Sequence, residues 1–367
     1  MKYKFLLITI FLTGLVGCQN AGTIGNRHSL HPKNVVYTHL EKKTVHPVSK
    51  EKLIQTKVTE YLLSHHINGS VAVINDNRII FNEGVGYSSF KNRKRNQSST
   101  TYPIGSITKA FVATSIMQLQ EKGKLNIEDP VSKYIPHFPN GKRIKLIHLL
   151  SHTSGIQNPI WHTRDSRPQD LIREIKKRHV TFRPGTKWEY RDANYMVLGY
   201  IVEKVAGMPL HDYIQFNIFD KANMGASGFI TRSYTVPYNS VGYMKQGQQL
   251  LRVGNFTIPL LFGCGDIYST AYDLSLFDQS LLNGNLVSNK SLKEMVTPRS
   301  KSKYGLGFYN NGNVFLSRGV LGGFESIHAL YKDKTSIAIL LNVRDKTINI
   351  HKTLREIHKL INLKIPV

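Results

Sequence analysis

Residues 110–119 constrain the fold most strongly, because they are apolar on most faces of a helix. A helix of this kind is buried, so other elements must cover it on every side. Directly before this stretch stands Ser106-Ile107-Thr108-Lys109. Side chains at positions i and i+3 share one face of a helix, so we expect the Lys109 amine to lie against the Ser106 hydroxyl.

Ser106 and Lys109 have the chemistry of a nucleophile and its base. The positive end of the helix favours negative charge on the Ser106 oxygen. A protonated lysine, with an ordinary pKa of about 10.4, cannot accept the serine proton. We therefore expect burial to lower the pKa of Lys109. Three other Ser-x-x-Lys matches lack this apolar setting: Ser49/Lys52, Ser88/Lys91 and Ser300/Lys303.

Further motifs follow in order along the chain: Leu125-Asn126-Ile127-Glu128-Asp129-Pro130-Val131, Leu149-Leu150-Ser151-His152-Thr153-Ser154-Gly155-Ile156, Phe182-Arg183-Pro184-Gly185-Thr186 and Gly263-Cys264-Gly265-Asp266-Ile267-Tyr268-Ser269-Thr270. Together with Ser106 and Lys109 they resemble the serine β-lactamase and penicillin-binding-protein superfamily, in the branch of class C β-lactamases, D-alanyl-D-alanine carboxypeptidases and related esterases. The resemblance covers roughly residues 55–345. It implies an α/β (α+β) fold of β-lactamase/transpeptidase type, with an antiparallel sheet flanked by helices and a mostly helical second lobe.

Hydrophobic alternation and turn residues agree with this fold. We expect helices near residues 50–65 and 347–363, and strands at 70–74, 78–81, 305–309, 314–317, 327–331 and 336–342. Strands near both ends of the chain then enclose a helical middle. The site is expected between the sheet and the helical lobe.

The second motif of this branch is usually Tyr-x-Asn, and here it is Tyr190-Arg191-Asp192. By resemblance, Tyr190 passes protons between Ser106, Lys109 and the leaving group. Asp192 departs from the pattern, because an ionised carboxylate only accepts hydrogen bonds whereas an amide also donates them. We expect Asp192 to keep Lys109 more cationic. The Tyr-x-Asp variant is similar to that of FmtA-type D-alanine esterases of teichoic acids.

The third motif, normally Lys-Thr-Gly or His-Thr-Gly, is degenerate. Counting back from Gly323-Phe324 places it at Ser317-Arg318-Gly319, and a second frame uses Leu321-Gly322-Gly323. In the first frame Arg318 holds a substrate carboxylate or phosphate, and the Val320 N–H joins the Ser106 N–H as an oxyanion hole. An ordinary strand arginine is the alternative. Loss of the usual Lys or His argues against efficient β-lactam turnover.

The amino terminus predicts export. Lys2 and Lys4 precede an apolar run at residues 5–12, which is too short to span a bilayer and has the form of a secretory signal. Leu15-Val16-Gly17-Cys18 is similar to a bacterial lipobox. We expect a lipoprotein signal at 1–17, a basic tether at 18–50 from lipidated Cys18, and a hydrolase domain at 51–367. The protein is then anchored by lipid to the extracytoplasmic face of a bacterial, Gram-positive cell membrane.

Net charge restricts the partners. The chain has 49 Lys and Arg against 24 Asp and Glu, a net charge of +25. We expect no nucleic acid, since no motif for it is visible and the chain is exported. Teichoic acids and anionic lipids are the polyanions outside such a membrane. No cofactor and no metal are expected, because the 15 His are scattered and no zinc-hydrolase motif occurs.

These patterns favour an exported, lipid-anchored serine hydrolase that acts through an acyl-enzyme on a cell-envelope ester or amide. D-alanyl esters of teichoic acid are the favoured substrate by resemblance. Two alternatives stay open. One is a D-alanyl-D-alanine carboxypeptidase, low-activity penicillin-binding protein or β-lactamase, acting on peptidoglycan stem peptides; the other is a non-catalytic envelope-binding lipoprotein. The oligomeric state is open as well.

The lipobox yields the first testable prediction. Cys18→Ala is expected to block lipidation and to leave unprocessed precursor or protein shed to the medium, because the thiol that carries the lipid is gone. Incorporation of radiolabelled palmitate into wild type and mutant measures this. Equal labelling of the two proteins would exclude Cys18 as the lipid site.

Overall fold

The computed structural model describes residues 49–160, 166–231, 237–254 and 258–363. The chain divides into two units, residues 1–47 and 48–367, and every element below belongs to the second. The predicted signal segment, Cys18 and the tether up to residue 48 lie outside the described residues. Of the helices that are described, none is long and apolar enough to cross a membrane.

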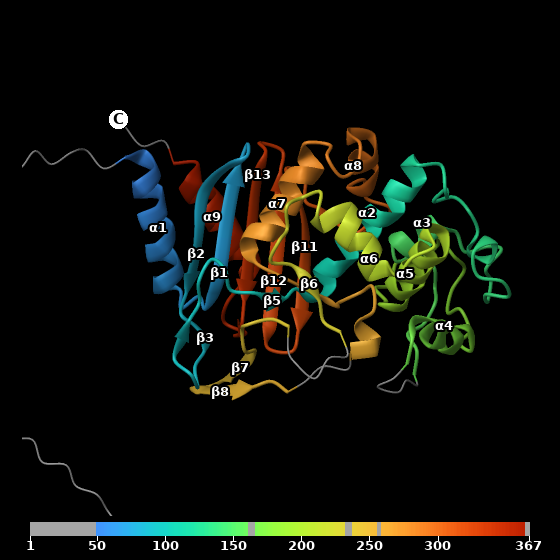
Figure 1. Ribbon diagram of the computed structural model, residues 1–367, viewed down its shortest axis with the longest axis horizontal. Coiled ribbons are helices and arrows are strands. Elements are labelled where there is room, and N and C mark those ends of the chain that lie inside the picture. Colours follow the sequence, from blue (N-terminus) through green and yellow to red (C-terminus); the bar gives the residue numbers. More distant parts are fainter. Residues whose placement is uncertain (1–48, 161–165, 232–236, 255–257, 364–367) are drawn as a thin grey trace, which may run out of the picture. The chain divides into compact units, whose positions relative to one another are not determined.

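An antiparallel sheet forms the frame of this unit (Figure 1). Within the described residues it has six strands in the order β10-β11-β12-β13-β1-β2. Their bounds are β1 Gly69–Asn75, β2 Arg78–Val85, β10 Tyr309–Asn310, β11 Val314–Leu321, β12 Phe324–Tyr331 and β13 Thr335–Leu341. Gly69 pairs with Leu341 and Asn75 with Thr335, so strands from the two ends of the unit lie side by side.

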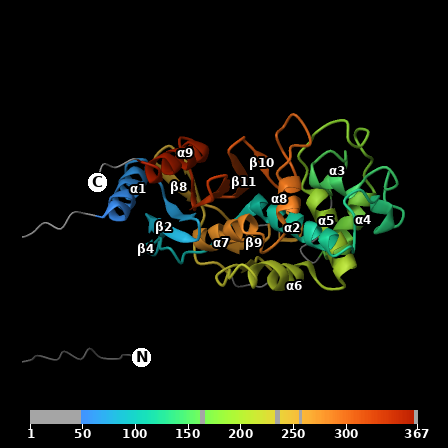
Figure 2. The same cartoon turned by 90° about the horizontal axis from the view of Figure 1, so that it is seen from above.

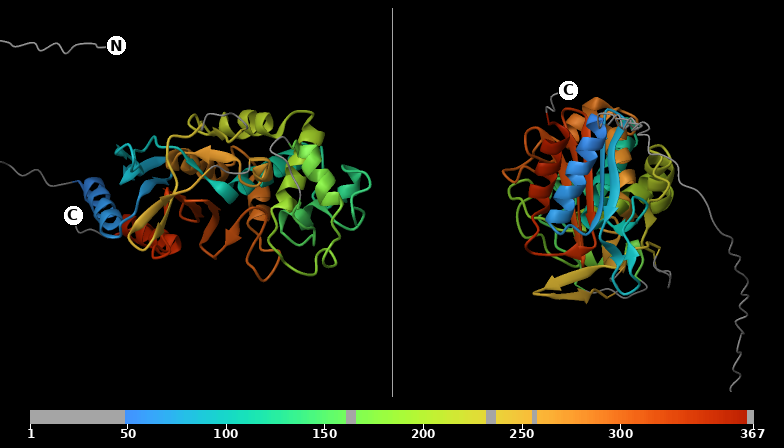
Figure 3. Two further views of the ribbon diagram at one scale, coloured as in Figure 1. Left: turned by 90° about the horizontal axis from the view of Figure 1, so that it is seen from below. Right: turned by 90° about the vertical axis from the view of Figure 1, so that its left-hand side faces the viewer.

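The two faces of the sheet follow the period of two that strands impose. Val71, Val73 and Ile339 belong to one buried cluster, which includes residues of α1 (Lys50–Ser64) and α9 (Ile350–Ile361). Ala72 and Ala338 belong to the other cluster, which includes residues of α7 (Ala271–Leu282). Figures 1 and 3 show α1 and α9 on the first side of the sheet and α7 on the second. The sheet is therefore covered on both faces.

The helical lobe is built around α2 (Thr108–Glu121), which lies among the other helices in Figure 2. Every residue of α2 from Thr108 to Leu119 is buried, which confirms the prediction from residues 110–119. Phe111 stacks on Phe277 of α7 with ring centroids 4.1 Å apart. This contact ties the lobe to the helix that covers the sheet. The other helices are α3 Leu146–Leu150, α4 Pro168–Lys176, α5 Ala193–Ala206, α6 Leu210–Ile214 and α8 Asn289–Met295.

Short elements complete the unit. The remaining strands are β3 Tyr87–Ser89, β4 Lys94–Arg95, β5 Tyr102–Pro103, β6 Gly228–Phe229, β7 Tyr243–Gln246, β8 Gln249–Arg252, β9 Ile267–Ser269 and β14 Val343–Arg344. The short helical turns are η1 Gly105–Ile107, η2 Val131–Lys133, η3 Gln215–Phe219 and η4 Ile258–Leu261. Strands β5, β9 and β6 pair in a small sheet, and β5 leads the chain into η1 and then α2.

The predicted antiparallel sheet with flanking helices and a helical lobe is confirmed, but one predicted strand is wrong. Residues 305–308 form a turn, in which the Gly305 N–H donates to the Phe308 carbonyl at 2.8 Å. Gly307 has φ of +87°, which a strand does not allow, and a methyl group there would lie 3.3 Å from the Lys109 carbonyl oxygen. Close packing on α2 bends the chain, and only Tyr309–Asn310 is left as β10.

Candidate active site

Ser106 lies in η1, the single tight turn that runs directly into α2. The turn positions the side chain at the N-terminal end of the buried helix, as the sequence predicts. Ser106 is half-buried, whereas Gly105 and Ile107 on either side are buried. Its hydroxyl is thus held by a rigid element and still reaches a cavity, which is what a nucleophile requires.

Strand β11 passes directly against this turn. A methyl group on Gly319 would overlap the Ile104 carbonyl oxygen and lie 3.0 Å from the Ser106 amide nitrogen, so only glycine permits this approach. A methyl group on Gly105 would lie 3.2 Å from the Val320 nitrogen. The backbone nitrogens of Ser106 and Val320 are thereby brought close together.

Pairing register directs the Val320 N–H away from β12. Leu321 and Phe324 flank a two-residue turn and pair with each other, and Val320 pairs with Glu325. In an antiparallel ladder, hydrogen-bonded and non-hydrogen-bonded pairs alternate, and the pair next to the turn is hydrogen-bonded. Val320 therefore points its N–H to the outer edge of β11, on the side of η1. Two backbone donors on one side of a serine hydroxyl can stabilise an oxyanion.

The Lys109 ammonium is fully hydrogen-bonded. Its nitrogen lies 3.0 Å from the Ser106 Oγ, 2.9 Å from the Cys264 carbonyl oxygen and 2.8 Å from the Asp192 carboxylate. An ammonium has three N–H donors, and these three acceptors use all of them. The side chain is only 1% exposed, so the charge is buried but paired.

The pKa of Lys109 corrects the prediction that burial leaves this amine neutral. Burial does disfavour the ammonium, but Tyr190 and the Asp192 carboxylate outweigh it, and the pKa lies above the ordinary lysine value. Asp192 thus keeps Lys109 cationic, as its replacement of the usual amide predicts. Lys109 donates a hydrogen bond to Ser106 in this state and cannot accept the serine proton.

The ring of Tyr190 also lies close to the Lys109 amine. The Lys109 nitrogen is 4.9 Å from the centre of the Tyr190 ring. Tyr190 and Ser106 line one cavity of about 430 Å³. Tyr190 is therefore the group in this cavity that can exchange a proton with the serine hydroxyl.

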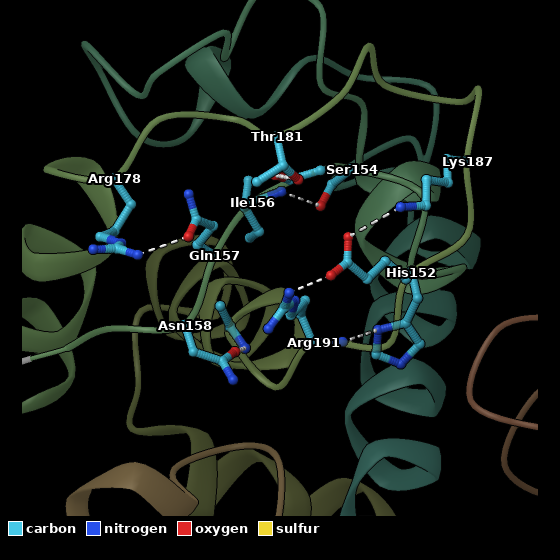
Figure 4. A network of polar contacts seen from close by, with 12 residues as sticks. His152, Ser154, Ile156, Gln157, Asn158, Arg178, Thr181, Lys187 and Arg191 are labelled. Atoms are coloured by element: carbon cyan, nitrogen blue, oxygen red, sulfur yellow. Dashed lines mark hydrogen bonds and ion pairs between the residues drawn. The ribbon is translucent and has the colours of Figure 1, made fainter.

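His152 holds the segment that carries Tyr190 (Figure 4). The Glu189 N–H donates to the His152 carbonyl oxygen at 2.9 Å, and the Arg191 N–H donates to His152 Nδ1 at 3.3 Å. Both chain neighbours of Tyr190 are therefore bonded to one residue. The His152 ring also packs on the Tyr190 ring with centroids 4.3 Å apart. The contacts of His152 thus extend beyond its own loop to the segment that carries Tyr190.

The hydrogen bond to Arg191 requires a neutral His152 with its proton on Nε2. Complete burial, together with the nearby Lys109 charge, holds the pKa of His152 well below its usual value. The acceptor at Nδ1 is therefore present at neutral pH. His152 adopts φ of +57°, which is uncommon for residues other than glycine although Asn, Asp and His are enriched there, and these contacts hold it in place.

The other wall of the cavity is formed by β11, β10 and the start of α9. It includes Ser317, Arg318, Tyr309 and His351. Arg318 Nε and Nη2 both donate to one oxygen of Glu325, at 2.9 and 2.6 Å. The Arg318 side chain is 40% exposed and lines the cavity, so donors that Glu325 does not use can reach a ligand.

The structure brings together every predicted residue of the three motifs. It favours the first frame of the third motif, because Gly322 and Gly323 of the second frame form the hairpin turn between β11 and β12. The Ser317 hydroxyl differs from expectation, since it donates to the Gly307 carbonyl at 2.7 Å and is occupied within the fold. Sequence reasoning missed Glu325, the carbonyl of Cys264 and the contacts of His152. Cys18 lies outside the described residues.

Comparison with known proteins agrees with this geometry. The sequence model of the Beta-lactamase family matches residues 51–349, most of the chain. The chain belongs to the β-lactamase family. It is a serine hydrolase of the β-lactamase and penicillin-binding-protein superfamily, as the order of its motifs predicts. The binding-only alternative is therefore not retained.

Relatives within the family include a putative penicillin-binding protein, PbpX, of Bacillus subtilis, which is 39% identical over 83% of this chain and 78% of its own length. A teichoic acid D-alanine hydrolase of Staphylococcus aureus is 31% identical over 78% of this chain and 73% of its own length. The crystal structure of FmtA from Staphylococcus aureus superposes with a TM-score of 0.76 at 26% identity, covering 86% of this chain and 88% of that one.

The position of His152 predicts a graded mutant series. His152→Ala is expected to slow acylation of Ser106 about 100-fold, because displacement of a reacting group by about 1 Å costs this much. His152→Asn is expected to stay within about ten-fold of wild type, since its amide oxygen can replace Nδ1 and Asn tolerates a positive φ. The rate of labelling by a fluorophosphonate, followed by intact-protein mass spectrometry, measures both.

Melting temperatures of the two variants provide the control. If the labelling rates fall in proportion to stability, and Asn gives no recovery, His152 only supports the fold.

Proposed function

We propose that this protein is a lipid-anchored enzyme on the extracytoplasmic face of a Gram-positive membrane that hydrolyses D-alanyl esters of teichoic acid. Ser106 is the nucleophile, Tyr190 moves the proton beside the Lys109 ammonium, and the N–H groups of Ser106 and Val320 form the oxyanion hole. The anchor is the lipid on Cys18. The relative named teichoic acid D-alanine hydrolase supports this substrate.

One observation carries the proposal: a partly exposed carboxylate is paired with the amine that contacts the nucleophile. The Asp192 side chain is 42% exposed although it pairs with buried Lys109. The acyl group of a D-alanyl ester carries a free ammonium, whereas penicillins and acyl-D-alanyl-D-alanine peptides present a carboxylate. A carboxylate in the site attracts an ammonium group of the substrate and repels a carboxylate. Asp192 therefore favours the amino-acyl ester.

The proton path follows from the bonding of Lys109. Because all three Lys109 donors are used, the Tyr190 phenolate takes the Ser106 proton while the ammonium stabilises the phenolate. Ser106 Oγ bonds to the ester carbonyl carbon, and the oxyanion is held by the two backbone N–H groups. When the C–O bond breaks, Tyr190 returns the proton to the polyol oxygen. Water then attacks the D-alanyl-Ser106 ester by the same path and releases D-alanine.

A D-alanyl-D-alanine carboxypeptidase is the second candidate. It is favoured by the putative penicillin-binding protein, which is 39% identical. Arg318 would then bind the terminal carboxylate of the stem peptide with the donors that Glu325 leaves open. The two candidates differ in the bond that is cleaved and in the charge of the substrate, so one assay separates them.

The substrate prediction compares two compounds. Wild type is expected to release D-alanine from a D-alanyl ester of glycerol phosphate. Its kcat/KM on this ester should be at least about 100-fold above that on an N-acyl-D-alanyl-D-alanine peptide. Ser106→Ala is expected to lose several orders of magnitude in kcat/KM on the ester. Released D-alanine is measured with a D-amino acid oxidase. A preference for the peptide would transfer the assignment to the carboxypeptidase.

The charge of Asp192 gives a pH prediction. A negative charge opposes loss of a proton from the coupled Lys109 and Tyr190, so Asp192→Asn is expected to move the acidic limb of kcat/KM to lower pH. The shift should be smaller than for a fully buried charge, because Asp192 is partly exposed. A propionyl ester, which has no ammonium, isolates this effect from substrate binding. A limb that stays in place or moves upward would show that Asp192 does not control the proton path.

A further inference from the structure

Basic residues gather on one segment that leads to the active site. Residues 176–191 contain six Lys and Arg but one acidic residue, Glu189. The whole chain has 49 basic and 24 acidic residues, so this excess is well above the average. We call these six side chains the basic edge: Lys176, Lys177, Arg178, Arg183, Lys187 and Arg191.

Half of the basic edge lacks a carboxylate partner. Among the described residues, Lys176, Arg178 and Arg183 have no acidic side chain within ion-pair distance. Lys176 donates to the Pro136 carbonyl at 3.0 Å and Arg178 to the neutral amide of Gln157 at 2.7 Å. These bonds orient the two cations but leave their charge uncompensated.

The other three cations of the basic edge share two acidic partners. Lys177 pairs with Glu174 at 2.6 Å, while Lys187 and Arg191 both use Glu189. The Lys187 ammonium is 4.0 Å from Glu189 and its side chain is 66% exposed. Ion pairs exposed to this extent contribute about 0–1 kcal/mol, so they do not prevent Lys187 from binding another anion.

The segment is fixed in place beside the site. The Thr181 N–H donates to the Gly155 carbonyl and the Gly185 N–H to the Thr153 carbonyl, both at 2.8 Å. Figure 4 shows Arg178, Lys187 and Arg191 around the loop that contains His152. Tyr190, the residue before the last of this segment, lines the cavity of Ser106. The end of the segment therefore adjoins the active-site cavity.

We propose that the basic edge is the docking surface for a polyol-phosphate polymer, whose repeating phosphates contact these cations while an ester side group enters the cavity. This inference rests on the proposed function and names how the polymer is held. A chain of regularly spaced negative charges complements a segment on which six cations are exposed or half-buried. A membrane fits less well, because none of the described large apolar side chains that are exposed lies in residues 176–191.

The test uses a pair of double variants with equal charge change. Arg183→Gln/Lys187→Gln removes two exposed cations from the basic edge, and neither residue belongs to the catalytic group. Lys290→Gln/Lys293→Gln, on α8, removes two exposed lysines that have no ion pair among the described residues. Each is placed in the full-length chain with Ser106→Ala, so that binding is measured without turnover. Melting temperatures check that both variants fold.

Binding to polyglycerol phosphate without D-alanine is measured between about 50 and 500 mM salt. The basic-edge variant is expected to bind about ten-fold more weakly at low salt, with a slope of log Kd against log salt that is smaller by about one to two, since each lost phosphate contact lowers the slope by nearly one. The α8 variant should stay within about two-fold of the parent. Equal losses in both variants, or none in either, would overturn the proposal.

Two further measurements distinguish polymer binding from membrane binding and from the proposed reaction. If the basic-edge variant loses binding to phosphatidylglycerol vesicles but not to the polymer, the surface serves a membrane and the proposal is wrong. With Ser106 restored, release of D-alanine from a small ester reports on the proposed function alone. Absence of that release in wild type, with polymer binding still dependent on the basic edge, would refute the reaction and leave the docking surface standing.

Discussion

The Lys109 ammonium connects three parts of the chain that are far apart in sequence. Its three donors reach Ser106 on the preceding turn, the carbonyl of Cys264 and the carboxylate of Asp192 at the start of α5. A buried charge is tolerated only when it is paired and hydrogen-bonded. Loss of any one acceptor would leave an N–H without a partner in a buried site. The geometry of the nucleophile therefore depends on elements that fold elsewhere.

The sheet and the helical lobe meet at this point. Gly319 allows β11 to approach the turn before α2, and this approach places the Val320 nitrogen beside Ser106. On the opposite side, His152 bonds to both neighbours of Tyr190. Nucleophile, oxyanion donors and phenol thus come from three different elements, each held by backbone contacts. Catalytic geometry of this kind needs rigid support from outside the reacting groups.

The sequence predicted the motif residues well because each motif combines a chemical group with a local signal. Ser106 and Lys109 were found from the apolar helix that follows them, and the sheet from alternating residues near both ends. The pKa of Lys109 was predicted in the wrong direction, because burial is visible in a sequence but the number of acceptors around a buried amine is not. Those acceptors include a backbone carbonyl, Cys264, which no side-chain pattern reveals.

Arg318, in the sheet, is a second residue whose partner the sequence did not predict. The sequence presents it as a binding residue with an open charge, whereas the structure pairs it with Glu325. Arg318 lies opposite Ile327, so Glu325 is its diagonal neighbour across the ladder. The Gly322-Gly323 turn sets this register, and a hairpin interpretation of these glycines would have revealed the pair. The prediction of a strand at residues 305–309 was wrong for a different reason. Packing of Gly307 on α2 overrides the local sequence pattern of this segment.

Charged side chains act both beside Ser106 and farther away, along the basic edge. Next to Ser106, the Lys109 ammonium is paired with Asp192, whose carboxylate stays partly exposed. The excess of +25 is carried by other parts of the chain. An unpaired cation beside the nucleophile would bind phosphate there and block the ester, whereas cations along an adjoining edge hold the polymer and leave the cavity open. Salt screens exposed charges far more than buried pairs. Polymer capture and bond cleavage can therefore respond differently to the same ionic strength.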